Sequence, residues 1–217
     1  GKGFVIVSPD DPGMHSSQNE QDNRYYARMG KIAMLEPSDS QEAKDMAAFG
    51  YELSETYDTP VMLRMTTRVN HSKSLVEFGE PREQVKREYV KNRAKFDPVP
   101  AMAAGMHVQV EKRWARLKEY TEKCPFNYEE WNTDEIGVVA SGIGYQYAKE
   151  TFGSRASYYK CGMTSPLPVE SIRAFAAKVK KLYVVEELEP YMEDQLHAAG
   201  IDCVGKALIP NIGELNP

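Results

Sequence analysis

Residues 4–26 read FVIVSPDDPGMHSSQNEQDNRYY, and this stretch decides how the rest of the chain is interpreted. Residues 4–7 predict a buried β-strand, because β-branched side chains suit a strand that is packed on both faces. The apolar run stops at Ser8-Pro9, and the chain turns at residues 11–13. Residues 15–24 contain no apolar side chain. Open α/β sheets bind ligands at the carboxyl ends of their strands, so this polar stretch is a candidate site.

Part of this polarity has a simpler explanation. Ser17-x-x-Glu20 matches a capping box, in which a serine and a glutamate satisfy the free N–H groups at the start of a helix. The stretch also holds Asp10, Asp11 and His15 ahead of that box. Two carboxylates and a histidine are more than a helix cap requires, so both interpretations stay open at this point.

The segments that follow alternate between strands and helices. Residues 32–35 and 61–68 predict two further strands, and Ser38-Asp39-Ser40 predicts the start of a helix that runs to about Tyr57. This alternation favours an α/β fold with a parallel sheet and right-handed crossovers.

The carboxyl ends of parallel strands lie along one edge of a sheet, and here that edge collects polar side chains from three turns. They are Asp10, Asp11, His15, Glu36, Ser38, Asp39, Thr66, Thr67, Arg68, Asn70 and His71. Ordinary turn polarity does not explain Arg68 and His71 beside uncharged hydrogen-bonding residues. We therefore predict a functional site at this edge.

The middle of the chain predicts a charged connection and one long helix. Residues 77–98 carry mixed charges and few apolar side chains, as a solvated helix or linker does. Residues 101–123 predict a helix with an apolar stripe at three- and four-residue steps. Beside the stripe, His107 is expected to be packed rather than catalytic.

Residues 136 onward predict a second α/β unit. Strands are expected at 136–140, 158–161, 182–185 and 201–204, with helices at 145–152, 169–180 and 189–199. The turn at residues 141–144 (SGIG) matches part of a dinucleotide fingerprint, but no acidic residue ends the next strand. We expect its glycines to serve close packing, and Glu186-Glu187 to form a local charge cluster.

The composition excludes several classes of protein. The 217 residues include 27 Lys and Arg and 32 Asp and Glu, which argues against a broad nucleic-acid surface. No apolar run approaches the length of a membrane span. Cys124, Cys161 and Cys203 are far apart and predict neither a structural zinc site nor a bound metal. A reduced, cytoplasmic setting is the simplest expectation.

Several motifs together resemble one known family. They are DDPGMHSSQNEQDNRYYA, MLEPSDSQEAKDM, TPVMLRMTTRVNHS, VVASGIGYQYAKE, GMTSPLP, VVEELEP and the terminal IGELNP. In this order they are similar to the α subunit of indolepyruvate:ferredoxin oxidoreductase, a thiamine-diphosphate-dependent 2-oxoacid oxidoreductase. The resemblance covers essentially the whole chain.

The resemblance implies a division of the chain into three parts. Residues 1–79 would be the C-terminal half of the domain that meets the thiamine pyrimidine, 80–133 a charged linker and long helix, and 134–217 a transketolase C-terminal-like domain. The family's Mg²⁺- and diphosphate-binding domain and its cysteine-rich iron–sulfur motifs have no match here. We therefore expect an internal fragment that alone binds no cofactor or iron and is inactive.

The resemblance also implies an activity: oxidative decarboxylation of an aryl 2-oxoacid to an acyl-CoA, with electrons passed to ferredoxin and with a β subunit as partner. The role assignments add position and chemistry to the family match. His15, Ser16 and Ser17 are candidates for hydrogen bonding near the reacting carbons. Candidate substrate-binding residues are Arg24, Arg68, Thr66, Thr67 and His71, with Arg24 or Arg68 as the cation for the substrate carboxylate. Asp10, Asp11 and Asp22 are expected to orient the loop.

Two other functions remain open on the sequence alone. The α/β units could serve only as an assembly scaffold for a partner subunit, or they could form a pair of nucleotide-binding units that use the turn at Ser141. A fragment cut ahead of its first strands would also expose a sheet edge, so we expect a possible homodimer.

Overall fold

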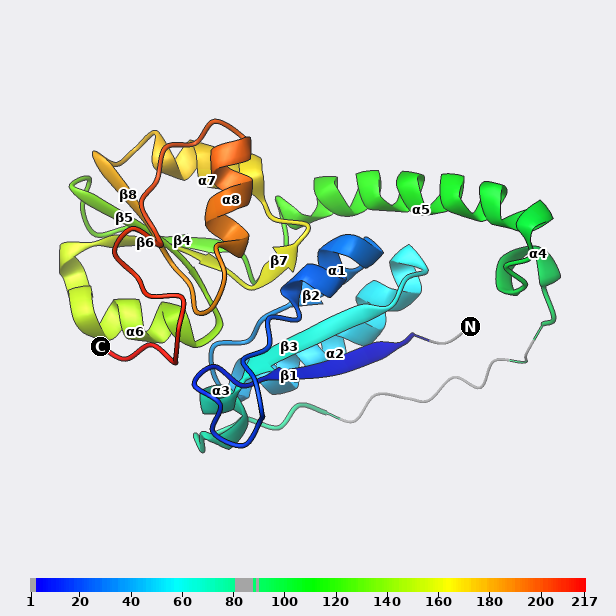
Figure 1. Cartoon of the computed structure of the whole chain (residues 1–217), viewed down its shortest axis with the longest axis horizontal. Coiled ribbons are helices and arrows are strands. Elements are labelled where there is room, and N and C mark those ends of the chain that lie inside the picture. Colours follow the sequence, from blue (N-terminus) through cyan, green and yellow to red (C-terminus); the bar gives the residue numbers. More distant parts are fainter. Residues whose placement is uncertain (1–2, 81–87, 89) are drawn as a thin grey trace.

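The computed structural model describes residues 3–80, 88 and 90–217. The chain is an α/β protein with two four-stranded sheets that lie side by side (Figure 1). Sheet A has the strand order β1 (Val5–Asp10), β3 (Val61–Thr66), β2 (Ala33–Leu35) and β7 (Met163–Ser165). Sheet B has the order β4 (Tyr128–Glu130), β6 (Ser157–Cys161), β5 (Ile136–Ser141) and β8 (Lys181–Val185). Most of the pairings are parallel. The predicted fold class, two parallel-sheet units of the α/β type, is confirmed.

Sheet A is built from the first third of the chain. Its parallel strands are β1 (Val5–Asp10), β3 (Val61–Thr66) and β2 (Ala33–Leu35). The connections are α1 (Arg24–Gly30) and α2 (Ser40–Tyr57). The first connection passes over β3 and the second returns beside it, so right-handed crossovers place the two helices on opposite faces.

The alternation of side chains along the strands fixes those two faces. Met34 and Met62 pack in one apolar core with Ala27 of α1, whereas their neighbours Leu35 and Leu63 pack in a second core with α2. Successive strand residues point to opposite faces, so a strand buried on both sides is apolar at every position.

Helix α2 begins and ends as its sequence predicts. The Asp39 carboxylate accepts a hydrogen bond from the Glu42 N–H at 2.9 Å, and thereby caps the first turn. Asp58 ends the helix with φ at 54°, in the left-handed region that asparagine and aspartate tolerate better than most residues. The adjacent Thr59-Pro60 then leads into β3.

The third strand is shorter than predicted. It ends at Thr66 instead of continuing to Arg68, and Thr67–His71 form the short helix α3. The Thr67 hydroxyl donates to the Asp11 carboxylate at 2.6 Å, which turns the chain away from the sheet at this point. Within the charged segment expected at 77–98, residues 93–96 form α4 (Arg93–Phe96), while residues 81–87 and 89 lie outside the described part.

The long helix α5 (Pro100–Thr121) passes above sheet A and leads toward sheet B (Figure 1). Its apolar stripe is buried only near its end, at Leu117, whereas Met102 is 43% exposed. The expectation that His107 is packed is wrong. Its side chain is 70% exposed and its Nε2 lies 3.4 Å from the Glu111 carboxylate, one helical turn away.

Sheet B follows the predicted order of elements. Strand β6 (Ser157–Cys161) pairs with β5 (Ile136–Ser141) in parallel, and β5 pairs with β8 (Lys181–Val185) in parallel. Strand β4 (Tyr128–Glu130), which the sequence did not predict, pairs with β6 in antiparallel fashion. The strand predicted at 201–204 is reduced to one bridge, between Val204 and Tyr183.

Three helices connect the strands of sheet B: α6 (Gly142–Phe152), α7 (Val169–Ala176) and α8 (Tyr191–Ala198). A Cβ atom on Gly144, in the first turn of α6, would lie 3.0 Å from the Val185 carbonyl oxygen. The packing explanation for this glycine turn therefore fits the structure.

Strand β7 (Met163–Ser165) crosses from the second unit to the first. It directly follows β6 of sheet B, yet it pairs antiparallel with β2 of sheet A. The crossing occurs at Gly162, whose N–H and that of Met163 both donate to the Asn127 side-chain oxygen at 2.8 Å. The domain boundaries given above stay a prediction, but the two sheets share this segment.

Strand β1 lies at the edge of sheet A, and Phe4 and Val7 are about 60% exposed. Self-association through this edge stays a prediction. Among the described residues, no helix is both long enough and apolar enough to cross a membrane.

The crossing at Gly162 provides a stability test. A Cβ there would lie 2.5 Å from the Cβ of Phe126 and 2.6 Å from its carbonyl oxygen, so Gly162→Ala forces the backbone to move. We expect Gly162→Ala to lower the free energy of unfolding by about 2 kcal/mol. The matched control is Gly105→Ala within α5, where no described atom beyond the chain neighbours and the adjacent backbone of the helix itself lies within 4 Å of the added Cβ. That change is expected to stabilise by about 0.5–1 kcal/mol, and urea denaturation measures both. Equal effects would show that Gly162 is not sterically required.

Candidate functional site

The sheet edge predicted to be polar lies at the carboxyl ends of β1 and β3. We call this edge, with Asp10, Asp11, Thr66, Thr67 and Arg68, the rim. Asp10 and Thr66 are paired across the two parallel strands, and Asp11 and Thr67 follow them. The loop of residues 12–23 lies at this rim (Figure 1). The chain's final segment reaches it through Gly213 and Glu214, which contact Glu20 and Arg68.

Asp11 organises the loop. Its carboxylate accepts hydrogen bonds from the backbone N–H groups of Ser16 at 2.8 Å, Ser17 at 2.9 Å and His15 at 3.2 Å. It also accepts from the Thr67 hydroxyl. The hydrogen bond from Thr67 and those from the loop amides hold the pKa of Asp11 well below its ordinary value. The ionised carboxylate of Asp11 thus fixes the conformation of the loop by accepting these hydrogen bonds.

Asp10 points to the other side of the strand, into the protein. It accepts from Arg64 Nε at 2.7 Å and from the Asn23 N–H at 3.0 Å, while Arg64 Nη1 donates to Glu36 at 2.7 Å. All three charged side chains are buried. Burial raises the pKa of Asp10. Arg64 was not among the predicted site residues, although a charge inside an apolar strand is itself a signal of a buried pair.

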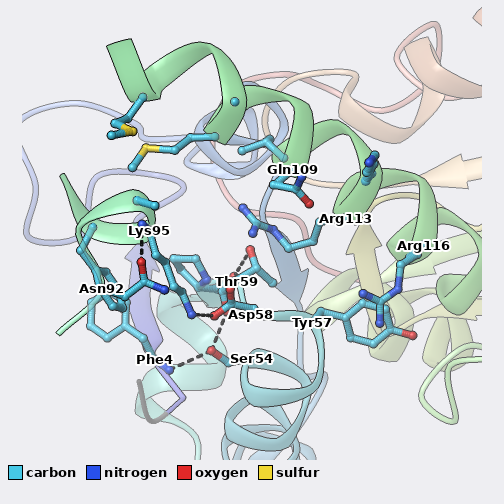
Figure 2. A pocket seen from close by; sticks show the side chains of 18 of the residues that line it. Phe4, Ser54, Tyr57, Asp58, Thr59, Asn92, Lys95, Gln109, Arg113 and Arg116 are labelled. Carbon is cyan, nitrogen blue, oxygen red and sulfur yellow. Dashed lines mark hydrogen bonds and ion pairs between the residues drawn. The ribbon is translucent and has the colours of Figure 1, made fainter. Parts of the chain in front are cut away.

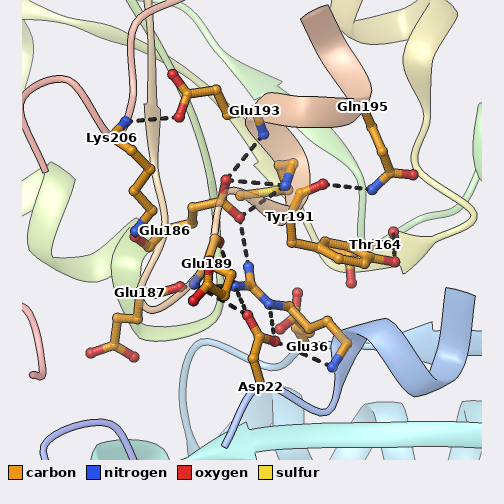
Figure 3. Close-up of polar contacts among 12 residues, drawn as sticks. Asp22, Glu36, Thr164, Glu186, Glu187, Glu189, Tyr191, Glu193, Gln195 and Lys206 are labelled. Atoms are coloured by element: carbon orange, nitrogen blue, oxygen red, sulfur yellow. Dashed lines mark hydrogen bonds and ion pairs between the residues drawn. The ribbon is translucent and has the colours of Figure 1, made fainter. Parts of the chain in front are cut away.

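Arg24 forms the second buried cluster, and it joins the two units. Figure 3 shows its partners Asp22 and Glu186 close together. The Arg24 Nε and Nη2 donate to the Asp22 carboxylate at 2.7 and 2.5 Å, and its Nη1 donates to Glu186 at 2.6 Å. Nη2 also reaches the carbonyl oxygens of Glu187 and Glu189. The side chain is 1% exposed. Each of the three guanidinium nitrogens is bonded to protein, so binding of a substrate by Arg24 would require these bonds to break.

Glu186 is therefore more than a member of a local charge cluster. Besides Arg24, its carboxylate accepts from the N–H groups of Met192 and Glu193 in the first turn of α8. The positive end of the helix and the guanidinium together compensate a carboxylate that is 1% exposed. Burial nevertheless raises the pKa of Glu186.

A second ion pair between the units involves the turn after β2. Lys160 of β6 donates to both oxygens of Glu42 in α2 at 2.6 Å, and its side chain is fully buried. Glu42 also accepts from the N–H and hydroxyl of Ser38. The turn after β2 is thereby fixed against sheet B.

His15 and Arg68 meet at a carboxylate that the sequence analysis did not identify. Arg68 binds Glu214 through two nitrogens, with its Nε 2.6 Å from Oε2, and His15 Nε2 lies 3.2 Å from the same oxygen. Glu214 lies 146 residues after Arg68. Glu214 belongs to the terminal motif IGELNP, which carries the family resemblance, and no local pattern signals such a contact.

The other predicted residues are distributed as follows. Ser16 and His71 are exposed and Ser17 is half-buried, whereas Thr66 is buried. Thr66 Oγ1 has no hydrogen-bond partner among the described residues. The interpretation of Ser17 and Glu20 as a capping box is wrong, because the helix that follows, α1, begins only at Arg24, with Asn23 before it. Glu20 instead accepts from the N–H groups of Gly13 and Gly213, both at 2.7 Å.

Two cavities differ greatly in size. A cavity of about 10 Å³ lies behind the rim, where Glu36, Arg64 and Thr66 line it together with the first residues of α6. A groove of about 880 Å³ lies elsewhere, between α5 and the end of α2. Figure 2 shows Gln109, Arg113 and Arg116 on its α5 side. The groove does not include the residues of the rim.

The described residues contain no group of three or more His, Cys, Asp or Glu side chains that could hold a metal ion. The three cysteines are buried and free. Burial raises the pKa of the Cys124 thiol to about 11, which keeps it protonated near neutral pH. The rim is thus a site of hydrogen-bonding and charged groups without cysteine chemistry.

Comparison with known proteins identifies related sequences. Residues 10–133 match the family described as pyruvate flavodoxin/ferredoxin oxidoreductase, thiamine diphosphate binding. A Methanothermobacter thermautotrophicus protein named indolepyruvate oxidoreductase subunit IorA is 39% identical, over 99% of this chain and 37% of that protein. The Thermococcus kodakarensis protein of the same name is 36% identical, over 98% of this chain and 36% of that protein. The chain thus spans about a third of the length of these relatives.

A solved structure shows a similar fold. It is a 2-oxoglutarate:ferredoxin oxidoreductase from Magnetococcus marinus, described with 2-oxoglutarate, coenzyme A and succinyl-CoA bound. The TM-score is 0.66 at 15% sequence identity, over 94% of this chain and 45% of that chain. At this identity the similarity concerns the fold alone.

The buried cluster at Arg24 predicts a large loss of stability on substitution. Arg24→Met leaves Asp22 and Glu186 buried without their cation, and we expect the free energy of unfolding to fall by about 3–5 kcal/mol. Arg93→Met is the control, since Arg93 pairs with Asp97 at 2.9 Å but is 75% exposed. Its loss is expected to stay below about 1 kcal/mol. Denaturant titration measures both, and similar losses would contradict a structural role specific to Arg24.

Asp11 predicts a pH-dependent contribution to stability. The pKa of Asp11 is lower in the folded chain than in the unfolded chain. The ionised carboxylate therefore stabilises the fold at pH values above 3.8, the ordinary pKa of the group. That contribution is lost as the pH falls toward the folded-state pKa. We expect wild type to be more stable than Asp11→Asn at pH 7, and the difference to narrow below pH 3.8. Urea midpoints across this range test the sign, and a constant difference would contradict it.

Proposed function

Because this chain belongs to the thiamine-diphosphate-binding family of pyruvate flavodoxin/ferredoxin oxidoreductases, we propose that it is part of an enzyme that oxidatively decarboxylates aryl 2-oxoacids. The products are an acyl-CoA and CO₂, and the electron pair passes to ferredoxin. The names of the IorA relatives support indolepyruvate as the type of substrate. A separate β subunit completes the enzyme in this proposal.

The observation that carries the proposal is that His15 and Arg68, both partly exposed at the sheet rim, contact the same carboxylate, Glu214. Arg68 is 53% exposed and His15 is 38% exposed, so both can meet a ligand from solvent. A guanidinium suits the carboxylate of a 2-oxoacid. Arg24 lacks this accessibility, which favours Arg68 as the substrate-binding cation.

The loop around Asp11 would supply the neighbouring hydrogen bonds. Ser16 and Ser17 follow His15 directly, and the carboxylate of Asp11 fixes their backbone N–H groups. Their hydroxyls can then donate hydrogen bonds to a carbonyl oxygen placed beside Arg68, next to the His15 ring. Thr67 already donates to Asp11, so we assign it to support of the loop.

The described residues fit one part of a thiamine diphosphate site. Hydrogen-bonding groups at the rim fit the pyrimidine side and the substrate, whereas no described cluster suits the metal that accompanies the diphosphate. When bound, the cofactor supplies the electron sink for decarboxylation. The chain's own residues would orient the carboxylate, donate hydrogen bonds and limit access of water. We place Mg²⁺, the diphosphate and the iron–sulfur clusters outside the described residues.

The test uses the complete protein that contains this chain, expressed with its partner subunit. Reduction of ferredoxin, or of an artificial dye, is followed with indolepyruvate, pyruvate and 2-oxoglutarate in the presence of coenzyme A. The proposal requires that turnover depend on thiamine diphosphate and coenzyme A, and that indolepyruvate give the highest kcat/KM. A higher kcat/KM with an aliphatic 2-oxoacid would show that the substrate is not an aryl 2-oxoacid. The proposed reaction, oxidative decarboxylation of a 2-oxoacid, would still stand.

Arg68→Ala in that complete enzyme is expected to lower kcat/KM by at least about a hundredfold, through loss of a charged hydrogen bond to the substrate. Thermal stability is expected to change little, because Arg68 lies at the surface. Arg173→Ala is the control: Arg173 also donates two surface hydrogen bonds, to Glu170 and the Ala199 carbonyl, but lies away from the rim on α7. Wild-type kcat/KM in Arg68→Ala would exclude Arg68 from the site.

A further inference from the structure

We propose that Glu214 is the positioning residue of this site, and that its carboxylate sets which atoms of His15 and Arg68 face the substrate. This inference rests on the proposed function for the identity of the substrate. The contacts on which it depends are independent of that function: Glu214 binds Arg68 through two nitrogens and approaches His15 Nε2 at 3.2 Å.

The contact with Glu214 determines how His15 can act. An ionised carboxylate has only acceptor oxygens, so the imidazole nitrogen that faces it must carry the proton. For neutral His15 this leaves the proton on Nε2 and the lone pair on Nδ1. Nδ1 is therefore the atom that His15 offers to a ligand, as a hydrogen-bond acceptor.

The same contact limits how Arg68 can bind. Glu214 takes Nε and one terminal nitrogen, Nη2, which form one edge of the guanidinium. The other terminal nitrogen, Nη1, has no hydrogen-bond partner among the described residues and is left for an incoming carboxylate. We infer that the 2-oxoacid carboxylate meets Arg68 through Nη1 while Glu214 stays in place.

The backbone on both sides of Glu214 is anchored, so the carboxylate is held in position. The Gly213 N–H donates to Glu20 at 2.7 Å, and the Leu215 N–H donates to Glu187 at 3.0 Å. Glu20 also accepts from Gly13 in the loop that carries His15. The hydrogen bonds from Arg68 lower the pKa of Glu214, which keeps it ionised near neutral pH.

The test compares Glu214→Gln with Glu129→Gln in the complete enzyme. Glu129 is the matched control, because it accepts from Lys178 at 2.7 and 2.9 Å on the antiparallel edge of sheet B. If Glu214 positions Arg68 and His15, Glu214→Gln raises the KM for the 2-oxoacid about tenfold with a smaller fall in kcat. Adding Glu214→Gln to Arg68→Ala then has little further effect on KM. A lower KM in Glu214→Gln would overturn the proposal, since it would mean that Glu214 competes with the substrate carboxylate.

Hydrogen exchange followed by mass spectrometry gives a readout that needs no activity. Amides of residues 12–17 are expected to exchange faster in Glu214→Gln than in Glu129→Gln, because the loop loses its contact through His15. Unchanged exchange together with an unchanged KM would overturn the positioning role. If the wild-type enzyme proves inactive toward every 2-oxoacid, the proposed function fails, and the exchange rates still decide whether Glu214 holds the loop.

Discussion

The guanidinium of Arg24 is the interaction on which the rest of the structure depends. It is buried, and its two carboxylate partners come from different units: Asp22 from the adjoining loop and Glu186 from a position 162 residues later. Charges removed from water are tolerated only when they are paired and hydrogen-bonded. The cluster is therefore complete only when the two units are in contact. Because Arg24 also begins α1, this contact fixes where the loop that carries His15 returns to the fold.

Arg24 and Arg68 show why residue type alone could not assign the site. Both are arginines near the same sheet edge, and the sequence offered either as the cation for a substrate carboxylate. Arg24 is 1% exposed and Arg68 is 53% exposed, so they stand in opposite environments. Asp10 and Asp11 are adjacent and both buried, yet they bind different partners. One pairs with buried Arg64 and the other gathers the amides of the loop.

Local sequence patterns predicted most secondary-structure elements, but they could not predict contacts between residues far apart in the sequence. The alternation of apolar runs with capped segments located most strands and helices of both units, though not β4, because these signals lie within a few residues of one another. The Asp39 cap is an example. Glu20 also matched a local motif, but its carboxylate binds Gly213 and Gly13 instead of capping a helix. The contact of Glu214 with Arg68 has no local signature, and neither has the pairing of β7 with β2.

The crossing of β7 into sheet A has a consequence for how the chain acquires its structure. Residues 163–165 complete the first sheet, but they follow α5, β4, β5, α6 and β6 in the sequence. During synthesis, the outer edge of β2 thus stays unpaired until β7, and with it much of the second unit, has left the ribosome. Such distant pairing makes folding slower than the local βαβ connections alone would allow. The two sheets are therefore expected to reach their native state together, with β7 joining late.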